Sequence, residues 1–137
     1  MGQAALNIAA GEGVTVIATT RNRERFTTLE ALCASKVLEE GPGMSQRVRE
    51  LYPQGADAVL ELVGNSTVLD SLKMVRRGGR LCEAGWLGGL TPIAEFNPLT
   101  QMPSGVQFSL FGSFEEIQEA HRLMESNQAN GKIVVVV

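Results

Sequence analysis

The pattern of apolar and polar residues predicts an α/β protein, and its clearest unit lies between residues 56 and 86. An apolar run at 57–63 predicts a strand, leucine and valine at helical spacing predict the helix that follows, and 81–85 predicts a second strand. Two strands joined by one helix form a right-handed βαβ unit, which places the loops at Gly64 and Gly85 at the same sheet edge. Ligands bind at this edge in open α/β sheets.

Shorter segments on both sides of this unit extend the alternation of helices and strands. The expected elements are a helix at 4–9, a strand at 14–19, a helix at 26–32, a strand at 36–38, a helix at 45–52, a strand at 106–111, a helix at 115–127 and a strand at 132–137. Ser45 and Ser66 are predicted helix caps, and Gly78–Gly79 are predicted to end the helix that starts after Ser66. Cys33 stands where a helix normally ends on glycine, so a left-handed conformation there would cost about 1 kcal/mol or more.

Composition and charge argue against several classes of protein. The chain has 137 residues, 44% of them hydrophobic, which predicts one domain with a substantial core. Its net charge of −3, with 12 Lys and Arg scattered among 15 acidic residues, argues against nucleic acid as a partner. No apolar run approaches the roughly 20 residues that span a bilayer, and Met1–Gln3 lacks the features of a secretory signal. We therefore expect a cytoplasmic protein without a membrane partner, in which Cys33 and Cys82 are reduced.

The segment Thr19–Arg25, which follows a predicted strand, carries the first indication of a ligand. A dinucleotide-binding domain that prefers NAD usually has an acidic residue at this turn, where it holds the ribose hydroxyls. Two threonines and three arginines stand here instead, and guanidinium groups suit the 2′-phosphate of NADP. A solvated helix start is the alternative interpretation. The glycine-rich phosphate loop of such domains needs a strand before the first helix, and of such a loop only Gly2 is a candidate here.

Five segments, in this order along the chain, carry a resemblance to a known family: Gly2–Leu6, Thr19–Arg21, Ala56–Asn65, Arg77–Arg80 and Gly85. Together they resemble the cofactor-binding domain of medium-chain dehydrogenases/reductases, in the branch of quinone oxidoreductases and zinc-type alcohol dehydrogenases. The resemblance covers essentially the whole chain. It implies an α/β, Rossmann-like parallel sheet flanked by helices that binds NADP(H), with hydride transfer to a quinone, enone or carbonyl held against a separate catalytic domain.

The chain also departs from this family's pattern. It lacks the first strand and most of the glycine-rich loop, and the family's catalytic domain would precede residue 1. Further elements are missing between Phe114 and Glu115. We therefore expect a truncated form: an incomplete NADP-binding Rossmann-like domain at 1–114, with a C-terminal helix and apolar strand at 115–137 packed on the same domain.

The resemblance assigns eight residues to a cofactor site, in groups that follow the dinucleotide. The groups are Thr20, Arg21 and Arg25 at the adenosine 2′-phosphate, Gly64 and Asn65 under the ribose, and Gly85 and Trp86 beside the nicotinamide, with Gly2 left from the phosphate loop. An ordinary strand-ending turn is the alternative interpretation of Gly64 and Gly85. The expected affinity for NADPH is low, because the pyrophosphate would face only a helix N-terminus and the free amine.

No catalytic residue can be named from the sequence. His121 shares the apolar face of its predicted helix with Ile117 and Met124, which is typical of a packed histidine. No set of Cys, His and acidic residues has the spacing of a metal site. Two interpretations stay open: the NADP-binding domain of an oxidoreductase with weak or no activity of its own, or a non-catalytic module that forms a homodimer through exposed strands.

The last predicted strand bears on how a sheet could form without its central first strand. Ile133–Val137 has the composition of a strand that is buried on both faces. We expect it to insert between the strands at 14–19 and 57–63, parallel to both, either within one chain or from a second copy. An edge position or a frayed tail is the alternative.

Overall fold

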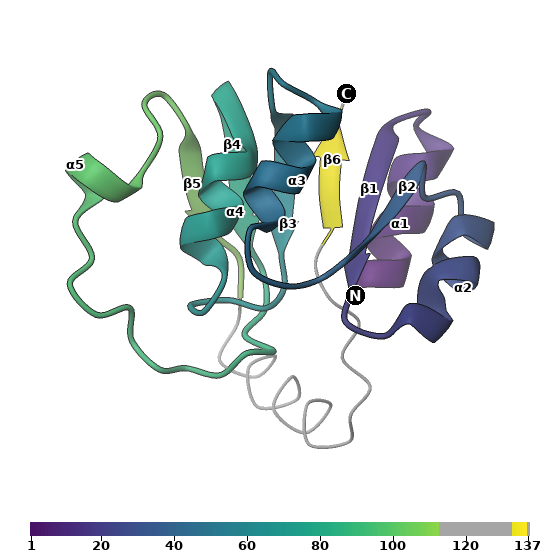
Figure 1. Ribbon diagram of the computed structural model, residues 1–137, viewed down its shortest axis with the longest axis horizontal. Coiled ribbons are helices and arrows are strands. Elements are labelled where there is room, and N and C mark those ends of the chain that lie inside the picture. Colours follow the sequence, from purple (N-terminus) through teal and green to yellow (C-terminus); the bar gives the residue numbers. More distant parts are fainter. Residues whose placement is uncertain (113–132, 137) are drawn as a thin grey trace.

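The computed structural model describes residues 1–112 and 133–136 (Figure 1). The elements are α1 (Gly2–Gly11), β1 (Thr15–Thr20), the 3₁₀ helix η1 (Arg23–Arg25), α2 (Phe26–Ala31), β2 (Lys36–Glu39), α3 (Met44–Leu51), β3 (Ala56–Glu61), α4 (Val68–Met74), β4 (Val75–Glu83), α5 (Pro98–Gln101), β5 (Gln107–Leu110) and β6 (Ile133–Val136). The helix predicted at 115–127 lies outside the described residues. Within the described residues, no helix has the length and apolar character to cross a membrane.

The strands form one sheet in the order β2-β1-β6-β3-β4-β5. β1 pairs in parallel with β2, and β3, β4 and β5 pair in parallel with one another. The carboxyl ends of these five strands meet at one edge of the sheet, the lower edge in Figure 1. This arrangement confirms the expected α/β, Rossmann-like fold, and the carboxyl edge is where such folds bind ligands.

β6 lies in the centre of the sheet, between β1 and β3, as the composition of its residues predicts. The predicted direction is wrong, because β6 is antiparallel to both neighbours: Ile133 pairs with Ala18 and Leu60, and Val135 pairs with Val16 and Ala58. Parallel and antiparallel pairing both satisfy the backbone N–H and C=O groups of β1 and β3. A strand in either direction could therefore fill the position between them. β6 starts at the carboxyl edge and runs toward the opposite edge, against the direction of β1 and β3 (Figure 1).

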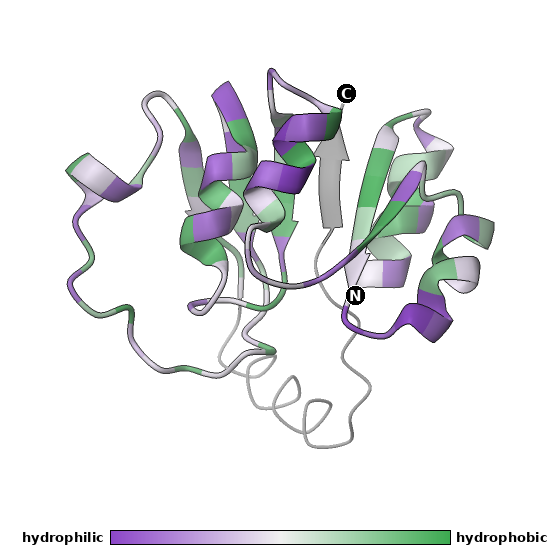
Figure 2. Cartoon of the chain, viewed as in Figure 1, coloured by the Kyte–Doolittle hydropathy of each residue, from purple (hydrophilic) through white to green (hydrophobic). Residues whose placement is uncertain are grey.

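Alternate residues of the central strands face two different layers of helices. One buried cluster joins the strands to α3 and α4, and its members include Ile17, Val59, Leu81, Met44, Val48 and Leu72. The cluster on the other face joins β1 and β2 to α1 and α2, and its members include Val16, Ala18, Val37, Leu6 and Leu29. Figure 2 shows the matching hydropathy: α3 and α4 carry both hydrophobic and hydrophilic residues, as amphipathic helices do.

The end of α4 differs from the sequence prediction. The helix ends at Met74, not at Gly78–Gly79, and β4 begins at once with Val75. The ladder between β3 and β4 is irregular there, since Ala56 pairs with Val75 but Ala58 pairs with Arg80. Gly78, at φ 78°, donates its N–H to the carbonyl of Gly105 at 3.0 Å. The glycines therefore form a bulge in a strand, because pairing with β3 and β5 outweighs the local helix-ending signal.

The two predicted serine caps are also corrected. Gly43, in the left-handed conformation, precedes α3, so Ser45 lies inside the first turn of that helix. Its hydroxyl donates to Asp70 Oδ1 at 2.6 Å. α4 follows Thr67 rather than Ser66, and neither helix has a side-chain cap from its own N-cap residue. At the start of α3, contacts with Asp70 of the neighbouring helix α4 replace a local cap.

Cys33 adopts the left-handed conformation that its position after α2 predicts, with φ 68°. Its N–H donates to the carbonyl of Glu30 at 2.9 Å, as expected at a helix end. The side chain is exposed. The backbone strain of a non-glycine residue is therefore present here without compensating burial.

Candidate functional site

A cavity of about 660 Å³ lies at the carboxyl edge of the sheet. Its described lining residues come from four loops and one helix: Arg21 after β1; Glu40, Gly41, Pro42 and Gly43 after β2; Val63, Ser66 and Thr67 after β3; Leu87 and Gly88 after β4; and Asp70 on α4. This size is typical of a small-molecule pocket, and the loops that form it follow the ends of parallel strands.

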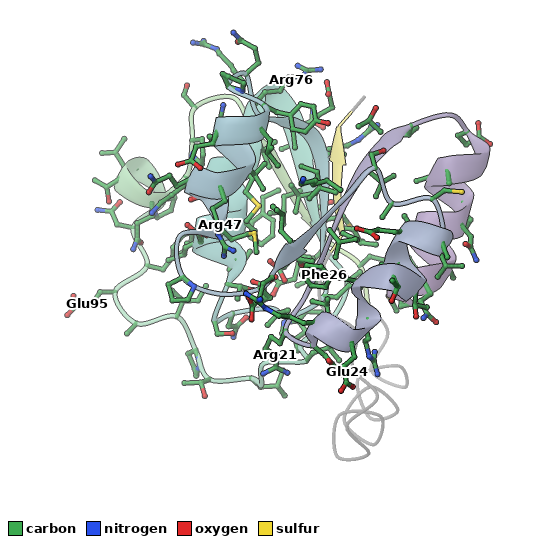
Figure 3. All side chains as sticks on the ribbon, turned by 45° about the vertical axis from the view of Figure 1, so that its right-hand side comes forward. Arg21, Glu24, Phe26, Arg47, Arg76 and Glu95 are labelled. Atoms are coloured by element: carbon green, nitrogen blue, oxygen red, sulfur yellow. The ribbon has the colours of Figure 1, made fainter. Side chains whose placement is uncertain are left out.

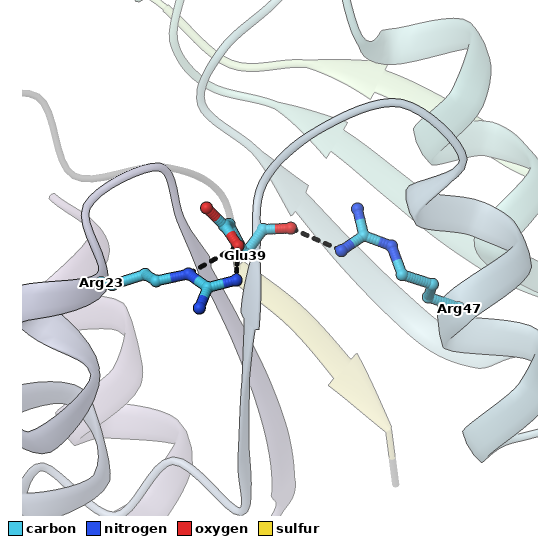
Figure 4. A network of polar contacts seen from close by, with 3 residues as sticks. All are labelled: Arg23, Glu39 and Arg47. Carbon is cyan, nitrogen blue, oxygen red and sulfur yellow. Dashed lines mark hydrogen bonds and ion pairs between the residues drawn. The ribbon is translucent and has the colours of Figure 1, made fainter.

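The wall after β2 is held by two arginines (Figure 4). Arg47, on α3, donates to the carbonyl of Glu39 at 2.7 Å and to that of Gly41 at 3.4 Å. Arg23 donates through Nε to Glu39 Oε2 at 2.8 Å, and this hydrogen bond is the main cause that lowers the pKa of the Glu39 carboxyl. Arg23 and Arg47 are thus engaged in holding the loop. Arg21 carries the positive charge among the described residues that line the cavity.

Asp70 connects α4 to the start of α3 beside the cavity. Its Oδ2 accepts the backbone N–H of Ser45 at 3.0 Å, and its Oδ1 accepts the Ser45 hydroxyl. A carboxylate at a helix N-terminus is stabilised by the free N–H groups and by the helix dipole. The positive end of α3 is therefore already matched by a charge from within the chain.

The turn between β3 and α4 is held by Glu61, a side chain with no exposed surface. Glu61 Oε1 accepts the N–H groups of Val63 at 2.7 Å and Gly64 at 3.3 Å, while Oε2 accepts the hydroxyl of Ser71 on α4. The carbonyl of Gly64 in turn accepts the N–H groups of Thr67 and Val68 at 2.9 and 3.0 Å. The strand end, the turn and the helix are joined in one network.

Glu83, the last residue of β4, pairs with Glu61 in the ladder between β3 and β4. It is 4% exposed, and its Oε1 has no hydrogen-bond partner within the part of the chain that the structure describes. Burial and then the charge of Glu61 raise the pKa of Glu83 to about 6. Removal from water disfavours the charged form, and a like charge nearby adds to this effect. A carboxyl group that titrates near neutral pH therefore lies at the carboxyl edge.

The structure separates the three residues predicted at the adenosine 2′-phosphate. Arg21 lines the cavity, and Figure 3 shows it near the carboxyl edge, far from Arg76 at the opposite edge. Thr20 ends β1, is 3% exposed, and accepts the N–H of Asn22 on its Oγ1 at 3.2 Å. Arg25 lies half-buried in η1 and is not among the described lining residues.

Gly64, Gly85 and Trp86 lie close to one another, and none of them is among the described residues that line the cavity. A Cβ atom on Gly64, which has φ 92°, would lie 2.8 Å from Cδ1 of Trp86 and 3.0 Å from the carbonyl oxygen of Gly85. A Cβ atom on Gly85 would lie 2.8 Å from the carbonyl oxygen of Leu62. Both glycines are thus required by contacts within the chain, which favours the interpretation of a close strand-ending turn.

The remaining two predicted residues also have local explanations. Asn65 donates through its side chain to the carbonyl of Thr91 at 2.9 Å, which ties the turn to the long loop after β4. Gly2 is buried at the first position of α1. The contacts of these residues with a cofactor stay a prediction.

Several lining residues are not among those predicted from the sequence. Gly41, Pro42 and Gly43 line the cavity, and Gly-Pro-Gly after a predicted strand is the signal in the sequence that could have indicated a loop at the carboxyl edge. Gly88 also lies in the wall, where a Cβ atom would be 2.5 Å from the Ser66 hydroxyl oxygen. Asp70 carries no local signal, because its partner Ser45 is 25 residues away in the sequence.

Comparison with known proteins decides the family. Residues 1–126 match the sequence profile of zinc-binding dehydrogenases. The chain belongs to this family. The match confirms the expected place among the medium-chain dehydrogenases/reductases, and it covers all but the last 11 residues of the 137. No curated protein matches the sequence.

Solved structures of similar fold include dehydrogenases and reductases. An NAD-dependent alcohol dehydrogenase has 24% identity and a TM-score of 0.69, covering 98% of this chain and 48% of its own. A quinone oxidoreductase of Pseudomonas syringae pv. tomato has 20% identity and a TM-score of 0.68, covering 93% and 43%. A mycobacterial protein complexed with NADPH has 24% identity and a TM-score of 0.71, covering 91% and 39%. These likenesses show the fold, and this chain spans less than half the length of each of these proteins.

The family's name raises the question of zinc. Across residues 1–112 and 133–136, no three His, Cys, Asp or Glu side chains are grouped closely enough to hold a metal ion. Structural and catalytic zinc sites use three or four such ligands. The described residues therefore do not fit a zinc ion, and we assign none of them as ligands.

Proposed function

We propose that this chain is the NADP(H)-binding part of an oxidoreductase that transfers hydride to a quinone, an enone or a carbonyl compound. The observation that carries the proposal is the position of Arg21. It follows β1 directly, it lines the cavity at the carboxyl edge, and it stands where an acidic residue would select NAD. Membership in the dehydrogenase family supports a nicotinamide cofactor, and one similar structure is described as a complex with NADPH.

The cavity suits the adenosine half of the cofactor. Its volume of about 660 Å³ lies within the range of sites for small molecules. In this proposal the Arg21 guanidinium binds the 2′-phosphate, because its fixed donors match phosphate oxygens. Gly41–Gly43 and Ser66–Thr67 enclose the adenosine. NADPH, when bound, supplies the hydride that the reaction transfers.

The proposal also keeps the other cofactor contacts predicted from the sequence, which have less support than that of Arg21. Gly85 and Trp86 belong to the nicotinamide side, Gly64 and Asn65 to the ribose, and Gly2 to the pyrophosphate, where affinity is expected to be low. The division into 1–114 and 115–137 and the cytoplasmic location are likewise retained as parts of the proposal. Residues 113–132 lie outside the described part of the chain.

Cofactor titration tests the proposal. NADPH fluorescence should change saturably on addition of the chain, and NADH should bind at least about tenfold more weakly, the loss expected for one charge-assisted contact. The Arg21→Asp variant should lose this preference. Arg77→Asp is the matched control, because it makes the same change of charge at an exposed position of β4 toward the opposite edge. Equal affinity for both cofactors in the parent chain, or no binding of either, would contradict the proposal.

A second candidate is a non-catalytic module that assembles through β5. In the described part of the chain β5 pairs only with β4, and Leu110 and Phe111 at its end are each 64% exposed. Exposed apolar residues on an edge strand favour pairing with a second copy. Sedimentation should then show a homodimer that Leu110→Lys converts to monomer. A monomer at all concentrations would remove this candidate.

A further inference from the structure

Glu61 is an acidic residue at a position where the strand would otherwise be apolar. Val59, two residues earlier on the same face of β3, belongs to the buried core, and Glu61 itself has no exposed surface. Burying a carboxylate is unfavourable unless hydrogen bonds replace its water. From the described part of the chain, Glu61 accepts hydrogen bonds from the N–H groups of Val63 and Gly64 and from the hydroxyl of Ser71.

These hydrogen bonds join Glu61 to a segment that contributes to the walls of the cavity. Four of the described lining residues, Val63, Ser66, Thr67 and Asp70, lie in the segment that Glu61 anchors at Val63, Gly64 and Ser71. The same segment holds the second wall, because the Val63 carbonyl accepts the N–H of Gly88 at 2.8 Å. An apolar side chain at position 61 could fill the same volume but could not orient these amides.

We propose that Glu61 is a positioning residue for cofactor binding: it holds the turn at Val63–Thr67 in the form that accepts the adenosine half. Glu61 is not among the described residues that line the cavity, so it acts through the backbone rather than by touching the cofactor. The proposal rests on the function proposed above, because it assigns the cavity to NADP(H). Its structural half, that the carboxylate holds the turn, can be tested without any cofactor.

Three variants separate positioning from general stability. Glu61→Leu keeps the volume and removes the acceptor. Glu61→Gln keeps an acceptor for the two amides and a donor for the Ser71 oxygen, so it serves as the conservative rescue. Asp57→Leu removes a carboxylate from the opposite end of the same strand, where it pairs with Arg76, and is the matched control.

The first measurement is amide hydrogen exchange by NMR without cofactor, at a temperature where each variant is folded. In Glu61→Leu the Val63 and Gly64 amides should exchange at least about tenfold faster relative to the core amide of Val59, because each loses its acceptor. Glu61→Gln and Asp57→Leu should leave this ratio within about twofold of the parent chain. If Glu61→Leu does not fold, Ser71→Ala, which removes one support of the carboxylate, should shift the ratio in the same direction. An unchanged ratio in the variant that folds would overturn the proposal.

The second measurement is the dissociation constant of NADPH. Glu61→Leu, or Ser71→Ala in its place, should weaken binding by about fivefold or more, while Glu61→Gln and Asp57→Leu stay within about twofold. Binding unaffected by a loosened turn would overturn the positioning role. If the parent chain binds no NADPH, the proposed function fails, and the exchange ratio still decides whether Glu61 holds the turn.

Discussion

Replacing Glu83 with glutamine should stabilise the fold at neutral and alkaline pH. The carboxyl group is buried at the end of β4 beside Glu61, and one of its oxygens has no hydrogen-bond partner among the described residues. Burial, with a further contribution from Glu61, raises its pKa to about 6 from an ordinary value of 4.5. Glutamine has nearly the same shape, carries no charge, and can donate to a neighbouring carboxylate.

The sign of the effect follows from the direction of the shift. A carboxyl group whose pKa is higher in the folded state binds its proton more tightly there. Its contribution to the free energy of unfolding is therefore fully present below about pH 4.5 and is lost as pH rises through about 6. The difference between these two pKa values corresponds to at most about 2 kcal/mol. Relaxation of the surroundings and water penetration around the charged carboxylate reduce the expected difference to about 1 kcal/mol.

Urea unfolding, followed by circular dichroism from pH 4.5 to 8, measures the difference in free energy of unfolding between Glu83→Gln and the parent chain. Glu83→Gln should exceed the parent chain in free energy of unfolding by about 1 kcal/mol at pH 8, and the difference should shrink toward pH 4.5. Glu30→Gln, an exposed position on α2, makes the same change of charge and should show no such trend. A difference that does not vary with pH, or a Glu83→Gln protein less stable than the parent at pH 8, would refute the reasoning.

Four further outcomes follow from the structure. Cys33→Gly should raise the free energy of unfolding by about 0.5 to 1 kcal/mol in thermal or urea melts, because glycine relieves the positive φ and its greater freedom in the unfolded chain offsets only part of the gain. Asp70→Ala should lower that free energy by about 1 to 2 kcal/mol, since it removes the acceptor at the start of α3, and Asp70→Asn should recover part of the loss. Deletion of residues 132–137 should abolish cooperative thermal melting, because β1 and β3 lose their shared partner; a truncated chain that melts as sharply as the parent would contradict the role given to β6. The chain alone should reduce simple quinones or aldehydes with a turnover number below about 1 per second, because hydride transfer needs a substrate held close to the nicotinamide.

The sequence was most informative where one physical requirement dominates a segment. Five consecutive β-branched residues at 133–137 are suited to a strand between two others, and β6 lies there. Thr19–Arg21 after an apolar strand predicts a phosphate-binding position; the structure places Arg21 in the cavity lining, and its contact with a phosphate stays a prediction. The left-handed conformation of Cys33 also agrees with the sequence, because Cys33 stands where a helix normally ends on glycine.

Where one local signal serves two purposes, the sequence alone did not distinguish them. Gly64 and Gly85 suit both a cofactor and a tight turn, and only the structure shows that Trp86 and the Leu62 carbonyl already require glycine there. Gly78–Gly79 suit both a helix end and a bulge. The structure has a bulge there, because β4 pairs with β3.

The sequence by itself indicated the family, most of the strands and helices in the described part of the chain and the positive charge after β1, because these depend on short-range patterns of side chains. The tertiary structure alone decided the direction of β6, the joining of Ser45 to Asp70, and the pairing of Glu61 with Glu83. Each of these depends on which segments meet in space. The direction of β6 and the register that places Glu61 opposite Glu83 depend on contacts between segments that are distant in the sequence. Neighbouring residues in the sequence therefore do not reveal them.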